Sequence, residues 1–90
     1  MTIHELKTWP VPFRDVLYEA KTFDVRRNDR DFQVGDLLRL REYDPDTGTY
    51  SGEEIIVQVD YTITLPEPKG FIGMGISGVR TYDSQTIQPA

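Results

Sequence analysis

The sequence predicts a small α+β protein that is mainly β, with about five strands and one short helix near the N-terminus. Three observations lead to this fold class. The chain has only 90 residues, which allow one domain with a single modest core. Alternation of apolar and polar side chains, typical of strands, recurs along the chain, whereas apolar residues at helical spacing occur in one short segment.

The elements are expected in a simple order. Residues 3–9 alternate loosely and predict a first strand. A helix is expected over residues 12–20, because Pro12 suits a first helical turn. Further strands are predicted over residues 23–27, 37–43, 54–63 and 71–77. Since open sheets leave unpaired edges, these strands are expected to curl or close into a small β-barrel.

Alternation also predicts which side chains share a face. Val59 and Tyr61 are expected on the same face of the fourth strand. In the last strand Gly73 and Gly75 leave one face bare, which often marks a bulge or the close approach of backbone or ligand.

Composition narrows the function classes. The net charge of −5 argues against a generic polyanion binder, since non-specific affinity for nucleic acid comes from many lysine and arginine contacts to phosphate. The chain has no cysteine and one histidine, His4, so we expect no metal site, no cofactor and no serine triad. His4 lies beside Leu6 on a strand and is predicted to be structural.

The chain is expected to be soluble and cytoplasmic, without a membrane partner. The N-terminus lacks an apolar signal core, and no stretch approaches the roughly 20 apolar residues that a membrane span needs. Residues 1–78 are predicted to form the single domain, and residues 79–90 a polar C-terminal tail.

Charged residues gather between residues 21 and 43. Asp24 and Arg26 are two residues apart and share a strand face, so they can line a cleft together or pair as an interior strut. Lys21 follows the predicted helix, where it can interact with the helix dipole or with a ligand.

The segment Lys21-Thr-Phe-Asp24-Val-Arg26 resembles the signature of the ASCH domain, a family of the PUA-like superfamily. That signature runs glycine, any residue, lysine, two of any residue, glutamate, any residue, arginine. The chain departs from it with Glu19 in place of glycine and Asp24 in place of glutamate. Together with residues 4–7, 28–44 and 70–76, this segment resembles a small phage and bacterial subgroup of the superfamily with no assigned function, and the resemblance covers roughly residues 3–77.

The resemblance implies a PUA-like β-barrel with a cleft beside the helix, into which Lys21, Asp24 and Arg26 project. The implied ligand is RNA or a modified nucleoside or nucleotide, which suits two cationic donors and one carboxylate acceptor. The residues expected on the rim are Arg27, Arg30, Arg39 and Arg41. The candidates for base stacking are Trp9, Phe32 and Tyr43.

Two alternative functions stay open. Some ASCH proteins are amidohydrolases that remove an acyl group from a modified cytidine with a lysine, a threonine and a glutamate. Lys21 matches the lysine, but Asp24 stands at the threonine position and no glutamate aligns near Met74. The second alternative is a protein-interaction domain, such as a phage accessory protein.

Overall fold

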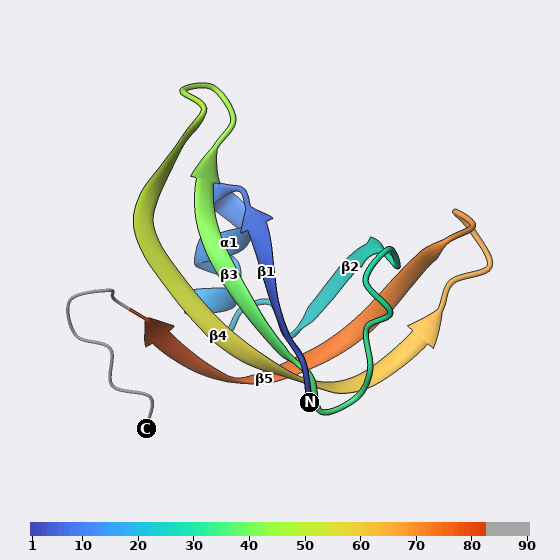
Figure 1. Cartoon of the computed structure of the whole chain (residues 1–90). Coiled ribbons are helices and arrows are strands. Elements are labelled where there is room, and N and C mark those ends of the chain that lie inside the picture. The colour runs from blue at the N-terminus through green and yellow to red at the C-terminus, as the bar shows by residue number, and fades with distance from the viewer. Residues whose placement is uncertain (83–90) are drawn as a thin grey trace.

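The computed structural model describes residues 1–82, which form one five-stranded sheet curled into a half-barrel, with a single helix (Figure 1). The predicted fold class, mainly β with one short N-terminal helix, is confirmed. The elements are β1 (Ile3–Thr8), α1 (Pro10–Leu17), β2 (Phe23–Arg27), β3 (Leu37–Asp44), β4 (Thr49–Thr64) and β5 (Phe71–Tyr82).

The strand order is β1-β3-β4-β5-β2, so the two N-terminal strands are the two edges of the sheet. β1 runs parallel to β3, and the remaining pairs are antiparallel. The long strands β4 and β5 bend, which carries β2 round towards the side of the sheet where β1 lies (Figure 1).

Three elements have a boundary that differs from the prediction by more than one residue. The helix begins at Pro10, since a proline at the first helical position loses no hydrogen bond, and it ends at Leu17, just before Glu19 adopts a left-handed conformation. β4 begins at Thr49, since the chain after the turn pairs directly back onto β3. β5 extends to Tyr82, so residues 79–82 of the predicted tail are strand, and residues 83–90 lie outside the described part of the chain.

The end of the helix fixes the position of Lys21. Glu19 adopts a left-handed conformation with φ of 58°, and its N–H donates to the carbonyl oxygen of Val16. The N–H of Lys21 then donates to the carbonyl oxygen of Asp15 across 2.9 Å. Lys21 therefore lies in the short turn between α1 and β2, hydrogen-bonded to the end of the helix.

A β-bulge reverses the two faces of β4. Val59 pairs with Ile76 and Tyr61 with Gly75, which leaves Asp60 as the extra residue. Val59 is buried, whereas Tyr61 is 63% exposed on the opposite face. The prediction that Val59 and Tyr61 share a face is therefore wrong, because simple alternation does not survive an inserted residue.

Apolar side chains from β1, α1, β3, β4, β5 and the loop between β2 and β3 form one core. The helix contributes Phe13 and Val16, which are both 1% exposed. The buried core consists of Leu6, Phe13, Val16, Phe32, Leu38, Leu40, Ile55, Val57, Val59, Ile72, Met74 and Ile76. This core holds the sheet in its curled shape against the helix.

The predicted structural role of His4 is borne out by a buried contact with Asp36. The His4 Nε2 atom lies 2.9 Å from Asp36 Oδ2, and the same carboxylate accepts hydrogen bonds from the backbone N–H groups of Thr2 and Gln33. The hydrogen bond from His4 holds the pKa of Asp36 below its usual range, although burial opposes the shift. This carboxylate ties the start of β1 to the loop between β2 and β3.

No helix within residues 1–82 has the length and apolar character needed to cross a membrane.

Candidate functional site

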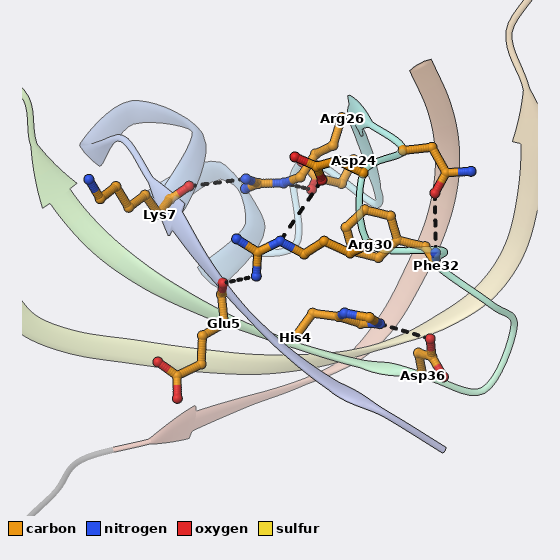
Figure 2. Close-up of polar contacts among 10 residues, drawn as sticks. His4, Glu5, Lys7, Asp24, Arg26, Arg30, Phe32 and Asp36 are labelled. Carbon is orange, nitrogen blue, oxygen red and sulfur yellow. Dashed lines mark hydrogen bonds and ion pairs between the residues drawn. The ribbon is translucent and has the colours of Figure 1, made fainter. Parts of the chain in front are cut away.

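Arginine side chains join the two edge strands of the half-barrel. Arg26 of β2 donates from Nη1 to the carbonyl oxygen of Lys7 across 3.1 Å and from Nη2 to Thr8 Oγ1 across 3.1 Å. Arg30 donates from Nη1 to the carbonyl oxygen of Glu5 across 2.8 Å (Figure 2). We call this line of contacts the seam, defined by Glu5, Lys7, Arg26 and Arg30.

At the seam, arginine side chains donate hydrogen bonds to backbone carbonyl oxygens of the edge strand β1. Glu5 and Lys7 are two residues apart on β1, so their carbonyl oxygens point to the same side. Unpaired backbone groups at a sheet edge need another partner. The two guanidinium groups supply it, and side chains rather than a further strand therefore connect β1 with β2 and its loop.

Lys21, Asp24 and Arg26, the three residues predicted to form a pocket, meet at one end of the seam. Arg26 Nε lies 2.5 Å from Asp24 Oδ2, and Lys21 Nζ lies 3.8 Å from Asp24 Oδ1. The Asp24 side chain is 9% exposed, whereas those of Lys21 and Arg26 are 24% and 23% exposed. A buried carboxylate thus holds two cations that still reach solvent.

These three residues line a cavity of about 450 Å³, which we call the first cavity. Asp24 and Arg26 therefore form a pair and also face a cleft, so the two arrangements that alternation left open occur together. The lining residues are Leu6, Lys7, Thr8, Trp9, Pro12, Lys21, Asp24, Val25, Arg26, Arg27, Asp29, Arg30 and Phe32. The volume lies within the range of about 300–1,000 Å³ of small-molecule sites.

Hydrogen bonds within the loop between β2 and β3 hold Arg30 at the seam. The N–H of Asn28 donates to the carbonyl oxygen of Gly70 across 2.7 Å, and Asn28 Oδ1 accepts from the N–H of Phe32 across 3.2 Å. Phe32 is buried, and its ring lies 4.7 Å from that of His4. Both ends of the loop are therefore fixed, which limits where Arg30 can reach.

A second cavity of about 440 Å³ adjoins the first. It is lined by Glu5, Leu6, Lys7, Arg26, Arg30, Arg41 and Tyr50. Leu6, Lys7, Arg26 and Arg30 line both cavities. The shared boundary of the two cavities is therefore built largely from cationic residues of the seam.

The four arginines predicted for the rim divide between different surroundings. Arg27 and Arg30 line the first cavity, and Arg41 lines the second. Arg39 lines neither: it lies 2.6 Å from Glu54 Oε1 and 3.2 Å from Glu5 Oε2, on the same face of β3 as Arg41. Arg41 contacts the same two glutamates, so strand pairing with β4 and β1 draws both arginines into an ion-pair network.

The three predicted stacking residues also separate. Trp9 lines the first cavity and is 59% exposed, so its ring is accessible to a ligand. Phe32 lines the same cavity but is 3% exposed and belongs to the core. Tyr43 lies outside the first cavity, with its ring 5.0 Å from that of Tyr50 and 4.5 Å from Lys7 Nζ.

Sequence reasoning missed the contributions of Lys7 and Thr8. Thr8 is buried and holds Arg26 through its hydroxyl group. The alternation of β1 contained a signal for it, because Thr8 shares a face with His4 and Leu6. Lys7 acts through its backbone carbonyl, which leaves no trace in residue type.

The opposite face of the sheet carries an apolar surface. Phe23 and Val25 of β2 and Tyr61 and Ile63 of β4 are exposed there on either side of β5. The sequence predicted a bare sheet face at Gly73, but the Ile63 side chain covers part of it. A Cβ atom added at position 73 would lie 3.2 Å from Ile63 Cγ2. These side chains line a hollow of about 370 Å³, which is separate from the seam.

Within residues 1–82, no group of three or more histidine, cysteine, aspartate or glutamate side chains is placed to hold a metal ion. The described lining of the first cavity contains aspartates but no glutamate. Met74 lies directly opposite Asp24 in the antiparallel pair of β2 and β5 and is buried.

Comparison with known proteins places the chain in a family. A domain of unknown function, DUF3850, matches residues 3–76, a range that holds both cavities and every residue of the seam. The search of curated proteins returned no match. Because the matched range covers most of the described fold, the chain belongs to the DUF3850 family.

Proposed function

We propose that this protein binds a nucleotide or a short single-stranded RNA in the first cavity. The observation that carries the proposal is the cluster of Lys21, Asp24 and Arg26 on the wall of a cavity that also exposes Trp9. Lysine and arginine donate to phosphate or base acceptors, the carboxylate accepts from exocyclic amines, and tryptophan offers a stacking face.

Local charge supports a small anionic ligand despite the acidic chain. The described lining of the first cavity includes four cationic side chains, Lys21, Arg26, Arg27 and Arg30, and two carboxylates, Asp24 and Asp29, whereas the Lys7 ammonium group lies at the Tyr43 ring outside this cavity. The local excess of positive charge favours phosphate. The overall charge of −5 favours a ligand of one or a few nucleotides over a long polyanion.

The resemblance to the ASCH domain gains support from the backbone at Glu19. The ASCH signature has glycine at this position, and Glu19 has a φ of 58°, a conformation that glycine adopts most easily. The proposal therefore includes a PUA-like relationship in which the first cavity corresponds to the cleft beside the helix.

Titration with nucleoside monophosphates and short single-stranded RNAs tests the proposal. Lys21→Ala removes one charge-assisted contact, so we expect the Kd to rise about ten-fold or more. Lys69→Ala is the matched control, because Lys69 is an exposed lysine that lines neither cavity. Equal affinities for Lys21→Ala and wild type would contradict the proposal.

A protein partner is the second candidate, and the exposed apolar surface of Phe23, Val25, Tyr61 and Ile63 favours it. Under this alternative, association with a purified partner survives nuclease treatment. Ile63→Glu abolishes that association, whereas Lys21→Ala leaves it intact. The reverse pattern contradicts the alternative.

The amidohydrolase alternative rests on Lys21 alone. It predicts release of the acyl group from an acylated cytidine and complete loss of turnover in Lys21→Ala. The absence of a glutamate from the described lining of the first cavity and the position of Met74 opposite Asp24 make binding the better supported function.

A further inference from the structure

We infer that the two cavities together form one groove for a dinucleotide unit of a single-stranded nucleic acid, with the linking phosphate at the seam. The inference rests on the proposed function and extends it from one nucleotide to two. It assigns a second base-binding position, at Tyr50, to a part of the molecule that sequence reasoning did not connect with the pocket.

The boundary between the cavities carries the charges that a phosphodiester needs. Arg26 and Arg30 line both cavities, and each is held by a hydrogen bond to the backbone of β1. Arg30 donates to Glu5 through Nη1, which leaves further N–H groups of this guanidinium for a ligand. A linking phosphate would thus meet cations that are already positioned.

Each cavity also has its own aromatic side chain. Trp9 lines the first cavity, and Tyr50 lines the second and is 40% exposed. The Tyr50 ring is held in place, because it packs edge-on against Tyr43 at 5.0 Å and lies 4.1 Å from the guanidinium carbon of Arg41. The Arg41 guanidinium lies over one face of this ring, so a base would stack on the other face of a ring that is fixed and partly exposed.

The similar sizes of the cavities fit two similar units. Their volumes are about 450 and 440 Å³. A ligand with one base and one phosphate fills one cavity and the boundary, whereas a dinucleotide also reaches Tyr50. The expected signature is therefore a gain in affinity from the second nucleotide that depends on Tyr50.

The experiment compares the Kd of the four nucleoside monophosphates with that of the corresponding dinucleotides ApA, CpC, GpG and UpU. The single tryptophan, Trp9, gives one indole N–H resonance that reports occupancy of the first cavity. We expect at least one dinucleotide to bind about ten-fold more tightly than its monophosphate, as one stacked base predicts.

Tyr50→Ala should remove that gain and keep the affinity for the monophosphate, whereas Tyr50→Phe should keep the gain. Tyr61→Ala is the matched control, because Tyr61 is an exposed tyrosine of the same strand that lines neither cavity. Equal affinities for monophosphates and dinucleotides, with the Trp9 resonance still shifting, would overturn the groove and leave the proposed function standing. If no ligand shifts the Trp9 resonance, both are overturned.

Discussion

Arg26 of β2 donates a hydrogen bond to the backbone carbonyl oxygen of Lys7 in β1, across the open side of the half-barrel. The same guanidinium contacts the buried carboxylate of Asp24. One side chain therefore links the two edges of the sheet and forms the wall of the candidate site. Stability and ligand binding should respond together to changes at this position.

Arg26→Ala should lower the free energy of unfolding by about 2 kcal/mol, because it leaves the buried Asp24 with Lys21 as its one remaining ion-pair partner among residues 1–82. Asp24→Asn combined with Arg26→Ala should cost less than Arg26→Ala alone, since the uncompensated charge is then absent. Urea unfolding of wild type, both single variants and the double variant measures this coupling. Additive losses would show that the two residues are independent.

Glu19→Gly should stabilise the protein by about 1 kcal/mol, since glycine adopts the left-handed conformation without the penalty of a side chain. Ala20→Gly is the control, because Ala20 follows in the same turn without a left-handed backbone and should be destabilised. Thermal unfolding of the two variants provides the comparison. A loss of stability in Glu19→Gly would mean that the Glu19 side chain matters more than its backbone strain.

The bulge at Asp60 can be tested with two isoleucines of β4. Ile55 is 1% exposed and Ile63 is 51% exposed, although unbroken alternation would place them on the same face. Ile55→Ala should cost about 2–5 kcal/mol through the cavity it leaves. Ile63→Ala should change the free energy of unfolding by no more than about 0.5 kcal/mol. Similar losses for both would place Ile63 in the core and contradict the bulge.

The contact between His4 and Asp36 predicts how the stability of the protein changes at acidic pH. A carboxylate whose pKa is lower in the folded chain stabilises the fold above its unfolded pKa, and that stabilisation disappears as the pH falls towards the lowered value. Wild type should therefore lose stability from about pH 5 downward more steeply than Asp36→Asn. Urea midpoints across this pH range measure both slopes, and parallel slopes would contradict the role of Asp36.

Local patterns predicted much of this fold. Alternation placed Asp24 and Arg26 on one face of β2, and the segment after the helix brought Lys21 beside them. The bulge at Asp60 could not be predicted, because an inserted residue leaves the pattern of residue types unchanged on either side.

The hydrogen bonds of the seam could not be predicted from the sequence either. Arg26 and Lys7 are 19 positions apart, and the acceptor is a backbone carbonyl that any residue would supply. Arg39, in contrast, was predicted for the rim from its residue type but lines neither cavity. Pairing of β3 with β4 places Glu54 beside it and draws it into an ion pair.

The most direct measurement is an amide chemical-shift titration of the labelled wild-type protein with nucleoside monophosphates and short single-stranded RNAs. We expect saturable shifts at the Trp9 indole and at the amides of Lys21, Asp24 and Arg26, with the amides of Gly73 and Tyr61 on the opposite face unchanged. Shifts confined to the opposite face, or none at millimolar ligand, would contradict a nucleotide site at the seam.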